Sequence, residues 1–385
     1  MHAASPVVSL TCTFGFHIIK KIIRELLQQK ISFLFYLLLF LLRLITKIKI
    51  APMKKIISCL LVTILCHNCF AQWQLSLTLG NNELIAGISS PTDNVIWVVT
   101  TDFTIYSTTN GGSNWKKIVP TGLANDISLT QLFTVNTTTA FLGVNTNFTG
   151  VGPGIIYKTT DGGKNWTQVF KHKGNCDIKF AMFDDNKGWM SCNFDSFNGS
   201  VPSGQSLYYT TNGGSKWNID SIHDPTKDFI QSIVINGSKL AIGDGKFFYY
   251  STNKGRNWTK QKYPSQIANT LLQFEDSNYI VTNGDISFSI IAKRPGNNKW
   301  KTSTGYPNGL ITTLVLDGNE CWTSEAFDAL PNYYSSDSAK TFTPFTVDAS
   351  AGFQFLVKAR NGRTLVGGTP SFMPGRIWIN KRSIL

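Results

Sequence analysis

The chain has 385 residues, with 36 Lys and Arg against 23 Asp and Glu, and a formal net charge of +13. Such a charge would suggest a nucleic-acid partner, but nine of the basic residues and one acidic residue lie in residues 1–72. The 27 basic and 22 acidic residues that remain give a net charge of +5, so the charge of the main part of the chain argues neither for nucleic acid nor for an acidic substrate.

The first seventy residues differ in composition from the rest. An apolar run, Ile31–Leu42, is flanked by Lys and Arg and is shorter than the ~20 residues of a membrane-spanning helix. From Met53, MKKIISCLLVTILCHNCFAQ has the basic start, apolar centre and small-residue end of a secretory signal peptide, with cleavage expected after Ala71. We interpret residues 1–52 as an over-extended start and 53–71 as the signal peptide. A retained N-terminal hydrophobic anchor is the alternative for residues 1–52.

Three cysteines remain after this leader: Cys176, Cys192 and Cys321. Cys176 and Cys192 lie on consecutive expected strands whose turn is centred on Asn186. In that register they do not face each other, so a disulfide needs a slipped pairing or a bulge. We therefore interpret all three as buried small apolar residues. No Cys and His spacing typical of a metal site is present, and we expect neither a metal nor a cofactor.

An eight-residue motif recurs from residue 108 onward. The aromatic residue that ends each copy recurs at intervals of 41 to 51 residues, which indicates stacked supersecondary units. The copies are TTNGGSNW (108–115), TTDGGKNW (159–166), TTNGGSKW (210–217), STNKGRNW (251–258), an eroded KRPGNNKW (293–300) and a weaker SSDSAKTF (335–342).

Each copy lies between two segments of alternating hydrophobicity, which predicts a β-hairpin. The Asp or Asn at the third position is expected to accept hydrogen bonds from the turn's own N–H groups. The Gly two residues further on provides a positive φ, and the Trp packs back over the turn. The motif is therefore predicted to be a self-contained hairpin, and its repetition to be structural.

These octapeptides resemble the Asp-box, or BNR, repeat of sialidases, sortilin-type receptors, some plant-polysaccharide hydrolases and photosystem II assembly and stability factor-like propellers. The resemblance covers residues 73–385 and implies a β-propeller in which the motif lies at the blade periphery, away from the active face. It assigns structural roles to Asn110, Gly112, Trp115, Asp161, Gly163, Trp166, Asn212, Gly214, Trp217, Asn253, Gly255, Trp258, Asp337 and Phe342.

The two ends of the repeat region predict how the ring closes. Trp73 lies 42 residues before Trp115, in phase with the strands that follow each octapeptide, and three further strands follow the last copy. Joining the first strand to the last three gives an all-β, seven-bladed propeller of four-stranded antiparallel blades over residues 72–385. This count is more similar to the photosystem II assembly factor-like propellers than to the six-bladed sialidases.

Four long loops are expected on the face opposite the octapeptides, at 145–154, 193–206, 324–332 and 368–375. Rigid scaffolds commonly carry binding residues on such loops. The loops contain aromatic residues that turns do not require, and these form the candidate binding surface: Phe148, Phe194, Phe197, Phe327 and Phe372. The alternative interpretation is that these rings fold inward and anchor the loops.

An enzyme on this scaffold would need paired carboxylates. Asp195 with Glu325 or Asp328 is the candidate acid and base pair for glycoside hydrolysis, although loop carboxylates are commonly solvated turn residues. No Arg-Ile-Pro motif precedes the repeats, which argues against a sialidase.

The sequence therefore predicts an exported, non-catalytic propeller that binds or assembles with an envelope or secreted protein, or with a glycan. We expect it in the periplasm, at the cell surface or outside the cell, without nucleic acid and without stable membrane insertion of the mature domain. The alternative is a secreted glycoside hydrolase other than a sialidase. A sensor-like extracellular domain is a third possibility if Ile31–Leu42 is a retained anchor.

Overall fold

The computed structural model describes residues 73–146, 152–194, 204–220, 230–244, 247–262, 270–275, 278–283, 290–293, 300–303, 311–325, 332–347, 352–370 and 372–381. All of them belong to one compact unit, Phe70–Leu385. The interpretations of residues 1–52 and 53–71 lie outside the described residues.

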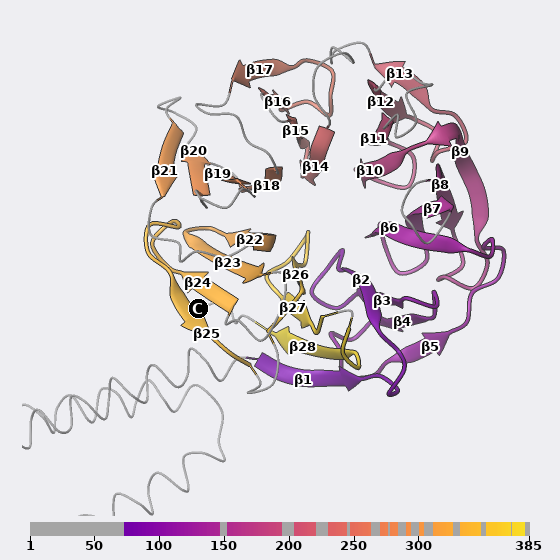
Figure 1. Cartoon of the computed structure of the whole chain (residues 1–385), viewed down its shortest axis with the longest axis horizontal. Helices are drawn as coiled ribbons and strands as arrows, with labels where there is room; N and C mark the ends of the chain where they lie inside the picture. The colour runs from indigo at the N-terminus through magenta and orange to yellow at the C-terminus, as the bar shows by residue number, and fades with distance from the viewer. Residues whose placement is uncertain are drawn as a thin grey trace, which may run out of the picture. The chain divides into compact units, whose positions relative to one another are not determined.

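Four-stranded antiparallel sheets make up the described unit, which confirms an all-β propeller (Figure 1). The first sheets in chain order are β2 (Ile85–Ser89), β3 (Ile96–Thr100), β4 (Ile105–Thr108) and β5 (Lys116–Ile118); β6 (Ile127–Thr134), β7 (Ala140–Thr146), β8 (Pro153–Thr159) and β9 (Thr167–Asn175); and β10 (Asp177–Met182), β11 (Gly188–Phe194), β12 (Gly204–Thr210) and β13 (Asn218–Asp220).

The next three sheets also use consecutive strands. They are β14 (Ile230–Asn236), β15 (Lys239–Asp244), β16 (Phe247–Ser251) and β17 (Thr259–Lys262); β18 (Thr270–Glu275), β19 (Asn278–Asn283), β20 (Ile290–Lys293) and β21 (Trp300–Ser303); and β22 (Ile311–Asp317), β23 (Glu320–Glu325), β24 (Asn332–Ser335) and β25 (Thr343–Phe345).

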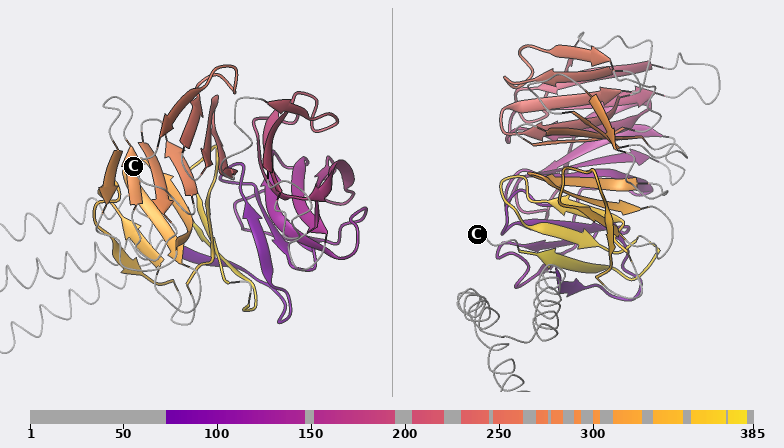
Figure 2. Two further views of the ribbon diagram at one scale, coloured as in Figure 1. Left: turned by 45° about the horizontal axis from the view of Figure 1, so that its top comes forward. Right: turned by 90° about the vertical axis from the view of Figure 1, so that its left-hand side faces the viewer.

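The remaining sheet is composite, with the order β1 (Trp73–Thr78), β28 (Arg376–Asn380), β27 (Leu365–Gly368) and β26 (Phe355–Lys358). Trp73 pairs with Asn380, and Thr78 pairs with Arg376. The chain thus forms six blades of four consecutive strands, and the expected count of seven is reached only by counting this composite sheet. Within the unit the sheets follow one another around a centre, and neighbouring sheets stack face to face (Figure 2).

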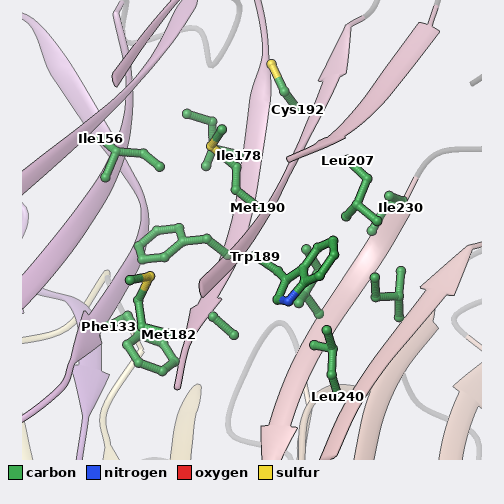
Figure 3. Close-up of a cluster of buried hydrophobic side chains, with 14 of the residues drawn as sticks. Phe133, Ile156, Ile178, Met182, Trp189, Met190, Cys192, Leu207, Ile230 and Leu240 are labelled. Carbon is green, nitrogen blue, oxygen red and sulfur yellow. The ribbon is translucent and has the colours of Figure 1, made fainter. Parts of the chain in front are cut away.

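The core lies between sheets. One cluster contains Phe133 and Ile156 from the β6–β9 sheet, Trp189 and Met190 from β11, and Leu240 from β15. Figure 3 shows the Trp189 ring between side chains of neighbouring sheets. Trp189 is 3% exposed and Phe180 and Met190 are fully buried, so association of the sheets removes these large side chains from water.

Five of the octapeptide turns, which we call clasps, share one hydrogen-bond pattern, and the turn at 294–299 lies outside the described residues. In the clasp after β8, the Thr159 hydroxyl donates to Asp161 Oδ1 at 2.9 Å and accepts from the Gly163 N–H at 3.1 Å. Asp161 Oδ1 also accepts from the Asn165 N–H at 3.0 Å. The same pairs occur at Thr108 and Asn110, Thr210 and Asn212, Ser251 and Asn253, and Ser335 and Asp337.

The first residue of the octapeptide is therefore as important to the turn as the third. Its hydroxyl lies inside the turn and links the third-position side chain to the fifth-position N–H, a role that the sequence analysis did not assign. The fifth residue has positive φ at Gly112, Gly163, Gly214 and Gly255, between 79° and 91°, and Ala339 takes this position in the last clasp at 61°.

The clasps are not self-contained, which corrects the sequence-based interpretation. A Cβ on Gly163 would lie 3.0 Å from the ring of Trp97 in β3, and one on Gly255 would lie 2.3 Å from the ring of Trp189 in β11. In both cases the contacted strand belongs to the preceding sheet. The clasp Trp rings behave similarly: Trp258 packs edge-on to Trp189 with centroids 5.4 Å apart, and Trp115 Nε1 donates to Ser76 Oγ in β1 at 3.0 Å.

A second correction concerns the cysteines. Cys176 and Cys192 form a disulfide, with Cα atoms 5.3 Å apart. The ladder pairs Ile178 with Cys192, but Cys176 lies just before β10 and donates its N–H to Gly152 O at 3.1 Å. Because Cys176 is outside the ladder, the register argument against a disulfide does not apply to it. Cys321 is a buried free thiol, as predicted, and burial raises its pKa.

Replacing Gly255 by Ala tests the contact between a clasp and the preceding sheet. Gly237 is the matched control, because it also has positive φ but a Cβ there has no atom within 4 Å. Both substitutions carry the backbone cost of about 1–2 kcal/mol for a left-handed residue. We expect Gly255→Ala to lower the free energy of unfolding by a further 1–3 kcal/mol or so through overpacking against Trp189. Equal losses in urea denaturation would contradict the inter-sheet contact.

The clasp carboxylates predict a specific acid dependence. Hydrogen bonds from the Asn165 backbone hold the pKa of Asp161 at about 2, and those from the Thr341 backbone hold the pKa of Asp337 at about 2. Because these pKa values are depressed, the stabilisation is present above the ordinary Asp value of 3.8 and is lost as pH falls towards 2.

The double variant Asp161→Asn, Asp337→Asn should keep both turns, since three clasps already carry Asn at this position. Between pH 4 and pH 2 or so its urea midpoint should fall less steeply than that of the wild type. Identical slopes for the two proteins would show that these carboxylates do not stabilise the fold.

Candidate binding site in the central channel

Figure 1 shows the innermost strands of the sheets around the centre of the unit: β2, β6, β10, β14, β18, β22 and β26. Residues of these strands line a cavity of about 270 Å³. Most of its lining comes from the second half of each strand and the residue or two that follow. Successive strands of a sheet run in opposite directions, so the turn after the first strand and the turn after the third strand lie on the same face. The innermost strands therefore end on the face that carries the clasps, opposite the long loops. The polar side chains in the lining are Ser89, Ser90, Gln131, Asn236, Gln273, Lys358 and Arg360.

Bulges in the innermost strands help to aim these residues. The register of β2 against β3 shifts between Ile85 and Gly87, and that of β6 against β7 shifts between Leu129 and Gln131. Similar shifts occur in β14 and β22. A bulge bends its strand and changes which side chains face inward. The alternation of the sequence gave no signal for these positions.

Several polar groups in the lining join neighbouring sheets. Gln131 bridges to β10, because its Nε2 donates to Phe180 O at 2.8 Å and its Oε1 accepts from Phe180 N at 2.9 Å. Ser89 Oγ lies 2.8 Å from Thr134 Oγ1 across β2 and β6. Lys358 Nζ is 3.2 Å from the Asp317 carboxylate of the neighbouring sheet. These contacts serve the packing of the ring.

Arg360 differs from these groups. It lies in the turn after β26, and its backbone N–H donates to Ser90 O at 3.0 Å. Its guanidinium lies over the Phe133 ring, 3.9 Å from the centroid, and Nη2 donates to the Thr134 carbonyl oxygen. The side chain therefore reaches past β2 to β6, and it forms part of the cavity wall.

The charge of Arg360 has no acidic partner among the described residues. The nearby carboxylates are engaged elsewhere: Asp93 accepts the N–H groups of Arg363 and Thr364 at 2.7 and 2.6 Å, and Asp317 pairs with Lys358 and Arg363. Burial lowers the pKa of Arg360 to about 10, so the group stays protonated at neutral pH. A half-buried guanidinium has five N–H donors and favours a carboxylate or another planar anion.

The described lining offers no carboxylate at all, so within those residues the channel lacks the paired acids that glycoside hydrolysis uses. Among the described residues, no helix has the length and hydropathy needed to cross a bilayer.

Most of the binding and catalytic residues predicted from the sequence lie outside the described residues. Phe148, Phe197, Phe327, Asp195 and Asp328 lie outside the described residues. Phe194 and Glu325 end β11 and β23, and only their backbone is described.

Phe372, in the loop between β27 and β28, is 61% exposed. It is not folded inward, so at this one position the anchoring alternative does not hold. Sequence reasoning gave no role to Arg360. The feature that could have indicated one is the presence of two arginines in a single turn, ARNGRT at residues 359–364.

No known family profile matches the chain, and no curated protein matches it. Solved structures do match. YCF48 bound to D1 peptide has a TM-score of 0.56 and 16% identity over 81% of this chain and 97% of that one. YCF48 from Cyanidioschyzon merolae has a TM-score of 0.55 and 15% identity over 80% and 99%.

An ancestral GH74 enzyme also matches, with a TM-score of 0.57 and 16% identity, over 78% of this chain but 45% of that one. At these identities the matches show a shared β-propeller fold. They assign neither a ligand nor an activity, because propellers carry many functions.

Proposed function

We propose that this protein is an exported, non-catalytic propeller that binds a segment of a protein partner at the clasp face of its central channel. The observation that carries the proposal is the Arg360 guanidinium, a cation in the cavity wall without an acidic partner among the described residues. The ligand group that it favours is a carboxylate from an acidic side chain or a chain terminus.

The fold comparison supports a protein partner over a glycan. One of the matching structures is YCF48 bound to D1 peptide, and this match supports a peptide segment as the ligand. The octapeptides add to this proposal through their resemblance to the Asp-box repeat, which occurs in assembly-factor propellers as well as in hydrolases. The GH74 match keeps glycoside hydrolysis as the alternative, but the described channel lining provides no acid for it.

Export is part of the proposal. It rests on the signal-peptide pattern of residues 53–71, with residues 1–52 as an over-extended start, and on the disulfide between Cys176 and Cys192, which suits an oxidising compartment. In such a compartment the partner would be an envelope or secreted protein.

Affinity capture from a native cell-envelope extract tests this function. The full chain and its Arg360→Gln variant are compared with Arg363→Gln, a neighbouring arginine whose side chain is 45% exposed and pairs with Asp317. The captured protein is then divided into synthetic peptides, and binding of the active peptide to each variant is titrated.

We expect Arg360→Gln to weaken peptide binding about tenfold or more, because a charge-assisted hydrogen bond is worth about 1.5–3 kcal/mol. Arg363→Gln should bind as the wild type does. Thermal unfolding verifies that both variants fold. Equal capture by wild type and Arg360→Gln would contradict the site. Specific recovery of glycans alone would contradict the protein partner.

A further inference from the structure

A group of three potential metal ligands lies where the β6–β9 sheet meets the β10–β13 sheet. The ligand atoms of His172, Cys176 and Cys192 all lie within 4.8 Å of one another. His172 comes from β9, Cys176 from the link between the two sheets, and Cys192 from β11. The cysteines are almost fully buried, and the histidine is half-buried. The group is separate from the channel site, and the inference below does not rest on the binding function proposed for that site.

A bulge in β9 brings the histidine to the cysteines. Pro153 pairs with Asn175 while Ile155 pairs with Lys171, so three residues, 172–174, lie opposite the single residue Gly154 of β8. Within it, His172 Nδ1 lies 2.9 Å from Gly174 O and 3.1 Å from Gly174 N. Such bulges commonly re-aim a side chain. A turn needed only to join two sheets would not require an imidazole beside two sulfurs.

The ring of His172 contacts the Gly174 backbone in a way that allows two tautomers: Nδ1 accepts from the Gly174 N–H in one and donates to Gly174 O in the other. Metal-bound histidines usually donate their second ring N–H to a carbonyl or carboxylate, which sets the tautomer. In the tautomer whose Nδ1 donates to Gly174 O, Nε2 carries the lone pair that binds a metal. Two thiolates and one imidazole are ligands that Zn²⁺ prefers, and a fourth position remains for water.

We propose that His172, Cys176 and Cys192 form a redox-dependent zinc site. In the oxidised protein the two sulfurs form the observed disulfide. A thiol reductant opens this bond in a two-electron exchange, which gives two protein thiols and the disulfide of the reductant. Zn²⁺ then binds both sulfurs as thiolates together with a ring nitrogen of His172, and two protons are released.

The oxidised and the reduced, zinc-bound states would cross-link the same junction between the β6–β9 and β10–β13 sheets in different ways. The disulfide ties the segment between the sheets to β11, whereas the zinc ion would tie β9 to β11 as well, because His172 belongs to the β6–β9 sheet. Figure 3 shows the Cys192 sulfur at the margin of the buried cluster around Trp189. Both cysteines belong to that buried cluster, so a metal ion bound to them would lie against the apolar core.

Zinc titration of the full chain tests the site. The protein is reduced with a dithiol, freed of reductant under argon, and titrated with Zn²⁺ against a chelating indicator, with Co²⁺ as the spectroscopic probe of thiolate ligation. The oxidised protein, His172→Asn and Cys321→Ser are titrated in parallel. Cys321 is the matched thiol control, because it is buried and free and lies in another sheet.

We expect the reduced wild type and Cys321→Ser to bind one Zn²⁺ per chain with a thiolate-to-Co²⁺ charge-transfer band. The oxidised protein should bind none, and His172→Asn should bind at least about tenfold more weakly at an unchanged thiol content.

Near-UV circular dichroism reports on the tryptophan environments of each sample. Three outcomes would overturn the proposal: a folded reduced protein that binds no Zn²⁺, His172→Asn binding as tightly as wild type, or a reduced protein that has lost its native near-UV spectrum.

Discussion

The contact between a clasp and the sheet before it, which occurs at the clasps after β4, β8, β12 and β16, is the constraint on which the ring depends. A Thr or Ser hydroxyl and an Asp or Asn side chain fold the octapeptide into a tight turn. The fifth residue, which has positive φ, is a Gly without a side chain or, in the last clasp, an Ala with only a methyl group. At Gly163 and Gly255 the space beyond is filled by a Trp ring of the preceding sheet. Turn chemistry inside one hairpin thereby sets how closely its sheet packs against the preceding one, and the same hydrogen bonds recur in the five described clasps.

The channel follows from the same packing. Sheets held at a regular spacing bring their first strands together at the centre, where Gln131 and Ser89 bridge adjacent strands. In the composite sheet the first described strand, β1, pairs with the last, β28. Charged groups in β26 and in the turn after it form further contacts with neighbouring sheets. Asp93 accepts two N–H groups from that turn, and Asp317 engages Lys358 and Arg363. Arg360 is the cation in this turn that has no acidic partner among the described residues.

Sequence reasoning succeeded where structure is local. A hairpin with Gly at positive φ can be inferred from eight residues, and the repetition of those residues predicts four-stranded antiparallel blades. It failed where the structure depends on contacts between distant parts of the chain. The Cys176–Cys192 pairing depends on Cys176 lying outside the ladder, and the register of channel residues such as Gln131 depends on a bulge in β6.

The same limit applies to the candidate site. Arg360 is an ordinary turn residue in the sequence, and only the fold places it over Phe133 in the wall of the channel. The aromatic loop residues were inferred from composition. Of these, the described residues include only the Phe372 side chain, which is exposed.

Native-state hydrogen exchange of the clasp amides tests the central claim most directly. The fifth-position N–H groups of Gly163, Gly214 and Gly255 donate to the hydroxyl of Thr159, Thr210 or Ser251, which are buried residues. If the clasps hold the sheets together, these amides exchange only in global unfolding, at rates close to those of core strand β7. Exchange as fast as that of the exposed turn residue Gly237 would show that the clasps open independently and that the ring does not depend on them.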